Sequence, residues 1–261
     1  MKWLRFCMIA ALMLFAVQCL AVAPPPSAVK YSQPPNMEWS YDLSSEIKQP
    51  PTGGPNIYES LMADDWLCNA TGTVTDIHWW GSYWTPYPGE PYADYSDSRP
   101  NAPAGGILGF NIAIWTDVPA SAQNPYSHPG TMIKPISITG NANETLAFQV
   151  TDPSGFLTHD VYKYDIDLSA NDQFNQVQDT IYWLSIQAIL PDLEKQWGWH
   201  ETTTIHNDIG VMKKGVESSW FIPCGGHDMA FELTTVPEPS GILVILSGLS
   251  GILGVAFRRR K

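Results

Sequence analysis

The segment Val161-Tyr162-Lys163-Tyr164-Asp165-Ile166-Asp167-Leu168 decides the fold class. Every second side chain in it is apolar: Tyr162, Tyr164, Ile166 and Leu168. The side chains between them are charged, and in an extended chain successive side chains point to opposite faces. The segment is therefore predicted to be a β-strand with one buried face and one face in solvent.

The same alternation recurs along most of the chain. It is clear at 106–116 and 180–190, and further candidate strands lie at 73–84, 132–138, 144–150, 218–223 and 228–235. No window of ten or more residues after the N-terminal region shows the 3.6-residue period of an amphipathic helix. We therefore predict an all-β fold for residues 56–235, an antiparallel β-sandwich of jelly-roll type. Residues 24–55 are rich in proline and are predicted to be an extended lead-in, with an early edge strand at 37–43.

The composition excludes several classes of protein. The 261 residues include 14 Lys and Arg against 26 Asp and Glu, a net charge of −12, and 15% of them are charged while 12% are aromatic. A nucleic-acid-binding protein needs clustered cationic surface, which this balance argues against. Coiled coils and helical bundles need more charged side chains on their exposed faces.

Residues 1–23 have the pattern of a secretory signal peptide. Lys2 and Arg5 precede an apolar run, and Ala21-Val22-Ala23 has the small-x-small form of a cleavage site. Cleavage one or two residues earlier fits equally well, because a proline follows directly. An acylated Cys19 is the alternative, which Gln18 disfavours because a small residue is wanted at that position.

The C-terminus, residues 236–261, has three consecutive parts. Val236-Pro237-Glu238-Pro239 comes first, residues 241–257 carry no charge, and the chain closes with the cations Arg258, Arg259, Arg260 and Lys261. A helix over the uncharged part is about 25 Å long, slightly less than a hydrocarbon core of about 30 Å. The sequence therefore predicts a short transmembrane helix whose basic end stays in the cytoplasm, with the upstream domain on the other side.

This order of motif, apolar helix and basic cluster resembles the PEP-CTERM sorting signal of Gram-negative bacteria. The resemblance implies that the tail holds the exported chain transiently in the inner membrane. It also implies a processing partner, an exosortase, which is a membrane-embedded cysteine transpeptidase-like enzyme that cleaves near Pro-Glu-Pro. The implied destination is the cell surface or the extracellular matrix.

Four phrases in the exported part resemble an uncharacterised domain of exported proteins from planctomycetes and related bacteria. They are Tyr31-Ser32-Gln33-Pro34-Pro35, Ala63-Asp64-Asp65-Trp66-Leu67-Cys68, Thr75-Asp76-Ile77-His78-Trp79-Trp80-Gly81 and Gln196-Trp197-Gly198-Trp199. This resemblance implies no activity.

The exported part is more acidic than the whole chain. Residues 24–240 hold eight Lys and Arg against all 26 acids, a net charge of −18. Such a surface can attract divalent cations, and Ca²⁺ is the cofactor considered. Asp165-x-Asp167-x-Ser169 begins like a calcium loop, but Ala170 stands where Gly is required and Gln176 where the bidentate Glu belongs.

Catalytic motifs are missing from the sequence. The six His residues show no zinc-ligand spacing, and no nucleophile elbow, phosphate loop or dinucleotide fingerprint occurs. We therefore expect no catalytic residues, no metal site and a protein that is not an enzyme. The adjacent acids Asp64 and Asp65 can place at most one carboxylate toward the core, where we expect a hydrogen bond to a loop backbone. The alternative is a polysaccharide-active enzyme, a glycoside hydrolase or lyase, that uses a carboxylate pair.

Tryptophans are the candidates for ligand binding. Aromatic faces can stack on sugar rings, and the candidate glycan-stacking residues are Trp79, Trp80, Trp84, Trp197 and Trp199. Core packing is the competing role, and alternation places Trp79 and Trp80 on opposite faces. After signal removal Cys68 and Cys224 remain, which either form a disulfide or stay separate thiols.

These observations predict an exported, non-catalytic sandwich that is sorted by an exosortase. Its expected role is structural or adhesive, with glycan binding and exopolysaccharide as the expected ligand class.

Overall fold

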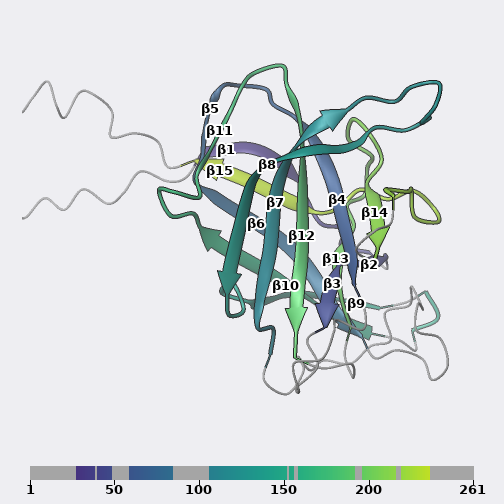
Figure 1. Cartoon of the computed structure of the whole chain (residues 1–261). Helices are drawn as coiled ribbons and strands as arrows, with labels where there is room; N and C mark the ends of the chain where they lie inside the picture. Colours follow the sequence, from purple (N-terminus) through teal and green to yellow (C-terminus); the bar gives the residue numbers. More distant parts are fainter. Residues whose placement is uncertain are drawn as a thin grey trace, which may run out of the picture. The chain divides into compact units, whose positions relative to one another are not determined.

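A computed structural model describes residues 28–235 except 39, 49–58, 85–105, 152, 156–157, 192–195 and 216–218. The described part consists of strands joined by turns and loops, with no helix (Figure 1). The strands are β1 (Ala28–Gln33), β2 (Asp42–Ser44), β3 (Glu46–Lys48), β4 (Ser60–Leu67), β5 (Gly72–Val74), β6 (Asp76–Trp84), β7 (Gly109–Val118), β8 (His128–Thr139), β9 (Thr145–Thr151), β10 (Thr158–Asp167), β11 (Phe174–Gln176), β12 (Ile181–Leu190), β13 (Gln196–His200), β14 (Val211–Lys214) and β15 (Phe231–Thr235).

The strands form two large sheets and one small one. The seven-stranded sheet has the order β1-β15-β6-β10-β9, and β13 joins it by pairing with both β6 and β2. The six-stranded sheet has the order β14-β4-β12-β7-β8, with β3 added parallel to β12. β5 and β11 form a separate antiparallel pair. β7 pairs antiparallel with both β8 and β12, so these three strands lie side by side in Figure 1.

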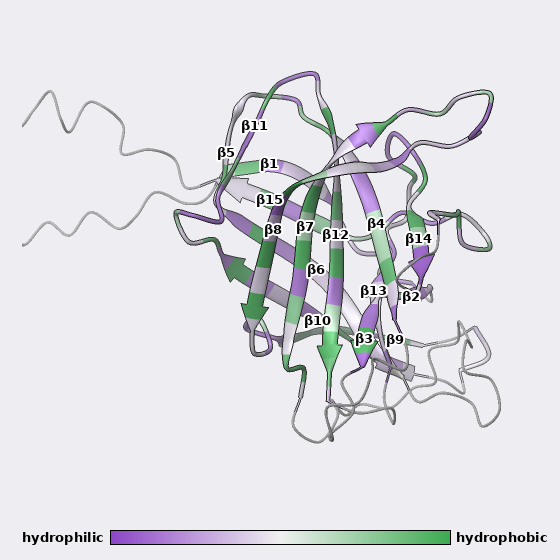
Figure 2. Ribbon diagram, viewed as in Figure 1, coloured by the Kyte–Doolittle hydropathy of each residue, from purple (hydrophilic) through white to green (hydrophobic). Residues whose placement is uncertain are grey.

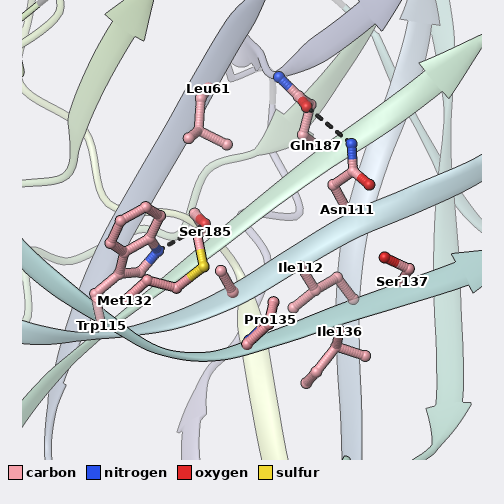
Figure 3. A pocket seen from close by; sticks show the side chains of 11 residues that line it. Leu61, Asn111, Ile112, Trp115, Met132, Pro135, Ile136, Ser137, Ser185 and Gln187 are labelled. Atoms are coloured by element: carbon pink, nitrogen blue, oxygen red, sulfur yellow. Dashed lines mark hydrogen bonds between the residues drawn. The ribbon is translucent and has the colours of Figure 1, made fainter.

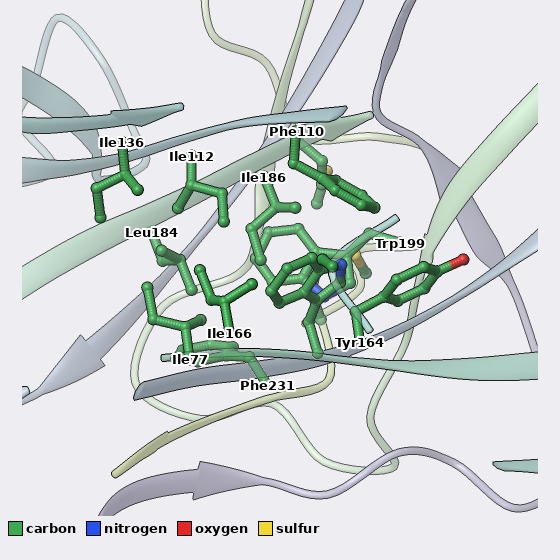
Figure 4. Close-up of a cluster of buried hydrophobic side chains, with 14 of the residues drawn as sticks. Ile77, Phe110, Ile112, Ile136, Tyr164, Ile166, Leu184, Ile186, Trp199 and Phe231 are labelled. Atoms are coloured by element: carbon green, nitrogen blue, oxygen red, sulfur yellow. The ribbon is translucent and has the colours of Figure 1, made fainter. Parts of the chain in front are cut away.

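The core lies between the inner faces of the two large sheets. β7 contributes Phe110 and Ile112, and β10 contributes Tyr164 and Ile166, all of them at most 5% exposed (Figure 4). Figure 2 shows the alternation of apolar and polar residues along β7 and β12 that produces such a face. The predicted antiparallel all-β sandwich is confirmed, and β10 has the half-buried pattern expected for it.

The first strands correct the predicted lead-in. β1 pairs with β15, β2 with β13 and β3 with β12, so the sandwich begins with β1 and not at residue 56. The expected edge strand at 37–43 reduces to β2, whose bounds are Asp42–Ser44. A high proline content therefore does not exclude strands: the short segments between the prolines pair with strands of both large sheets.

Two of the strands that the alternation did not predict, β4 and β13, have both of their faces covered. β4 has only Leu61 and Leu67 outside the buried class, and β13 is buried throughout. A strand without a solvent face shows no alternation of apolar and polar residues. The strand predicted at 218–223 is wrong, because the described part of it forms only an isolated bridge from Phe221 to Met212.

A second apolar cluster covers part of the outer face of the six-stranded sheet. It consists of Ala63, Trp183, Val211 and Trp220, with Leu61, Trp115 and Tyr126 packed against it. Beside it, over β7, β8 and β12, the described residues form no further apolar cluster on this face.

Candidate functional site

The structure places three of the five candidate tryptophans in the core. Trp79, Trp197 and Trp199 are each 0% exposed, so their faces cannot stack on a sugar. The Trp79 ring stacks on Tyr164 with a centroid distance of 5.4 Å and meets Phe110 edge-on at 4.9 Å. The glycan-stacking role predicted for these three residues is therefore corrected to core packing. Aromatic rings of this size fill the space between two sheets.

Trp80 faces the other way, as the alternation predicted. Its side chain is half-buried, and the Lys163 ammonium lies 5.8 Å from the centroid of its ring. Lys163 also forms an ion pair with Asp165 at 2.7 Å, so this face of β10 is a paired polar surface. The side chain of Trp84 lies outside the described residues.

A shallow hollow of about 260 Å³ lies on the open outer face of the six-stranded sheet (Figure 3). Its side chains come mainly from β7, β8 and β12: Leu61, Asn111, Ile112, Ala113, Trp115, Met132, Pro135, Ile136, Ser137, Ser185 and Gln187. The sequence contained a signal for it, because Asn111 and Trp115 occupy the face of β7 opposite Phe110 and Ile112. The apolar residues of that alternation face the core.

Hydrogen bonds hold the side chains of the hollow in fixed positions. Trp115 Nε1 donates to Ser185 Oγ at 2.9 Å, and Asn111 Nδ2 donates to Gln187 Oε1 at 3.2 Å (Figure 3). Gln187 Nε2 donates in turn to the Ser60 carbonyl at 2.8 Å. Asn111 itself is exposed, so its carbonyl and its second N–H remain available to a ligand.

Both carboxylates of Asp64 and Asp65 are buried, although adjacent residues of a strand point to opposite faces. Asp64 Oδ2 accepts from the Met229 backbone N–H at 2.6 Å, and Asp65 Oδ1 accepts from the Asp208 backbone N–H at 3.2 Å. The expected hydrogen bonds to a loop backbone are confirmed. Both faces of β4 are covered, one by the core and the other by the loop that follows β13.

Burial changes the protonation of these acids. It raises the pKa of Asp65 from 3.8 to about 8, and burial together with Asp228 raises the pKa of Asp64 well above its usual range. Burial likewise raises the pKa of Glu46, on β3, to about 7. None of these three side chains has a route to a substrate, because each is 0% exposed.

A third group of buried polar side chains joins three strands of the seven-stranded sheet. Asp42 from β2 lies between His159 from β10 and His200 from β13, and their ligand atoms all lie within 4.8 Å of one another. Burial alone would raise the pKa of Asp42, but the charge of His200 and the close approach of both imidazoles outweigh it and hold this pKa below its usual range. Burial opposes the charged form of His200, but Asp42 outweighs it and raises the His200 pKa. No motif in the sequence marks this group, since no two of its members are neighbours in the chain.

The two cysteines of the exported part are free thiols. Cys68 is buried at the end of β4 and its thiol donates to the Ala70 carbonyl at 3.3 Å, whereas Cys224 is exposed in the loop before β15. The disulfide alternative is therefore corrected to separate thiols.

The predicted signal peptide, the sorting motif, the apolar helix and the basic cluster all lie outside the described residues. Within the described residues, no helix is long and apolar enough to cross a membrane.

Comparison with known proteins identifies both parts of the chain. Residues 235–261 match the PEP-CTERM protein-sorting motif, and residues 29–234 match a domain of unknown function, DUF7901. No curated protein and no solved structure matches significantly. The motif is the recognition signal of an exosortase, so the protein is exported, handled at the membrane and sorted by that enzyme. The chain belongs to the DUF7901 family, and its β-sandwich is the family domain followed by a sorting tail.

Proposed function

We propose that the sandwich is a non-catalytic surface or matrix module that binds neutral glycans in the hollow over β7, β8 and β12. The observation that carries this proposal is the half-buried ring of Trp115 beside the exposed amide of Asn111. The processed protein would reach the cell surface or the extracellular matrix, with exopolysaccharide as its ligand there.

The hollow combines the two kinds of contact that a sugar ring needs. Trp115 and Met132 supply apolar surface, while Asn111, Ser137 and Gln187 supply amide and hydroxyl groups for the sugar hydroxyls. The Trp115 ring also meets Trp220 edge-on at 6.1 Å, which fixes its orientation before a ligand arrives. Such pre-organisation reduces the entropy cost of binding.

The charge of the exported part favours neutral over acidic glycans. With a net charge of −18 over residues 24–240 it repels polyanions. None of the side chains that line the hollow within the described residues is an acid, so the hollow offers no carboxylate pair for glycosidic bond cleavage. No observation favours the polysaccharide-active enzyme over the binding module.

A matched pair of tryptophan variants tests the proposal. The full-length protein, purified in mild detergent, is applied to affinity gels of neutral and acidic polysaccharides, and retention is compared for wild type, Trp115→Ala, Asn111→Ala and Trp80→Ala. We expect retention on a neutral polysaccharide to fall by about tenfold or more for the first two variants, because each removes a central contact. Trp80→Ala is the control, since this half-buried ring lies on the other sheet. Equal retention of all four proteins, or none, would refute glycan binding in the hollow.

The absence of catalytic activity and the sorting route are tested separately. If the protein released reducing ends from any polysaccharide used in the retention experiment, the proposal that it is not catalytic would be wrong. For the second, the double variant Pro237→Ala, Glu238→Ala should keep its tail in cells that contain the exosortase, as read by the mass of the membrane-bound chain. The neighbouring change Ser240→Ala is the control and should leave processing intact.

A further inference from the structure

Asp42, His159 and His200 bring two imidazoles and one carboxylate together in a buried part of the molecule. All three side chains are 0% exposed, and they come from three different strands. His200 and Asp42 are partners in the register of β13 and β2, so their side chains share a face of the sheet. The Phe148 ring, on β9, packs edge-on against His200 with a centroid distance of 5.8 Å.

Among the described residues, only one of the two carboxylate oxygens of Asp42 has a hydrogen bond. Asp42 Oδ1 lies 2.7 Å from His200 Nδ1 in a hydrogen bond. Asp42 Oδ2 lies 3.2 Å from His159 Nε2, but among the described residues it has no partner with hydrogen-bond geometry. A buried carboxylate oxygen without a hydrogen bond is costly unless a cation fills the space in front of it.

The separation of these two atoms suits a shared metal ion. Two ligands at zinc distances of about 2.0–2.1 Å, at a tetrahedral angle, lie about 3.3 Å apart. The observed 3.2 Å between Asp42 Oδ2 and His159 Nε2 is close to that value. A direct charge-assisted hydrogen bond would be shorter and aligned.

The surroundings of His200 also fit a ligand role. Its Nε2 lies 2.8 Å from the Asn36 carbonyl, which only accepts, so this nitrogen carries a proton. Its Nδ1, which is hydrogen-bonded to Asp42 Oδ1, would bind the metal after losing its proton. Ser40 Oγ lies 3.3 Å from the same Nε2. Histidines that bind metals commonly donate their second N–H to a backbone carbonyl, which fixes the ring.

We propose that Asp42, His159 and His200 form a structural site for one divalent transition metal, with zinc as the best fit. Two imidazoles and a carboxylate suit zinc, whereas calcium takes oxygen ligands almost exclusively. The metal ties β2, β10 and β13 together, so its role is to stabilise the fold. The site is independent of the glycan-binding hollow, which lies on the other sheet.

The buried position determines how the experiment is done. Because no ligand atom reaches solvent, the metal is taken up during folding, so the full-length chain is unfolded in guanidinium with a chelator and refolded with or without Zn²⁺. We expect about one zinc per chain by elemental mass spectrometry and a melting temperature about 5–10 °C higher with the metal. Ca²⁺ in place of Zn²⁺ should give neither effect.

Two variants and one control separate the site from adventitious binding. His159→Gln and His200→Gln should lose the zinc, whereas His128→Gln, on β8 of the other sheet, should keep it. If the first two variants fail to fold, refolding the wild type with Co²⁺ provides a second readout, because cobalt bound by histidine and carboxylate absorbs visible light. A refolded wild type with less than about one tenth of an equivalent of zinc, no cobalt absorption and an unchanged melting temperature would overturn the proposal. The group would then be a metal-free ion pair.

Discussion

Among the fully buried tryptophans, Trp79 and Trp199 differ in whether the indole N–H has a hydrogen-bond acceptor. Trp79, Trp197 and Trp199 are each 0% exposed, so replacing any of them with Phe removes the same atoms from a similar environment. Trp199 Nε1 donates to the Ala230 carbonyl at 2.8 Å. Trp79 Nε1 has no acceptor among the described residues. The two changes Trp199→Phe and Trp79→Phe therefore isolate the effect of one buried hydrogen bond.

The contacts of the two indoles indicate how far the free energies of unfolding of the two variants should differ. Each replacement loses packing worth about 1–2 kcal/mol, a fraction of the 3–5 kcal/mol lost when Trp becomes Ala. Trp199→Phe also leaves the buried Ala230 carbonyl without its partner, which adds about 1–3 kcal/mol. Trp79→Phe instead removes a buried N–H that has no partner, which recovers a similar amount. We expect Trp79→Phe to be nearly neutral and Trp199→Phe to be less stable by about 2 kcal/mol or more.

Urea unfolding of the full-length chain, followed by far-ultraviolet circular dichroism, measures this difference. The free energies of unfolding come from linear extrapolation and are compared only between variants with equal slopes. Trp80→Phe, at a half-buried position, is the control and should change the free energy by less than about 0.5 kcal/mol. If Trp79→Phe destabilises the protein as much as Trp199→Phe, the reasoning from the unpaired N–H is wrong.

Three other predictions follow from the described residues. Because burial raises the pKa of Asp65 from 3.8 to about 8, the folded state binds a proton more tightly than the unfolded state, so this contribution to stability is full below about pH 4 and declines up to about pH 8. Melting temperatures across that range should therefore fall with pH, and less steeply for Asp65→Asn; the same slope in both proteins would contradict this. Gly81→Ala places a Cβ 2.4 Å from the Trp197 ring and should destabilise the protein by about 3 kcal/mol or more in urea; a loss below about 1 kcal/mol would refute the clash. A thiol reagent should label Cys224 in the folded protein and Cys68 only after unfolding, whereas a mass that shows a disulfide would exclude both statements.

Two of the strands that the sequence predicted correctly have one covered face. β7 and β10 show the alternation that this environment requires. β12 was also predicted from its alternation, although only Ile181 and Ile189 lie outside its buried class. β4 and β13 contain polar residues that are buried by loops and by other strands, so their environment depends on the rest of the chain. The periodicity within one segment does not show whether another part of the chain buries its second face.

The candidate site shows the same limit. Trp79 and Trp80 were correctly assigned to opposite faces, but the alternation does not say which face is the core. Trp115 and Asn111 lie on the open face of β7, and only the pairing of β7 with β8 and β12 makes that face a hollow.

The sequence by itself determined the sorting motif, the class of fold and the acidity of the exported part. These depend on residues that are close together in the chain or on composition, and local physics acts on both. The tertiary structure decided which tryptophans are buried, where a glycan could bind and that Asp42 meets His200 across 158 positions of sequence. Contacts of that kind arise only when the sheets close on each other, because the free energy of burial that brings the residues together belongs to the whole sandwich.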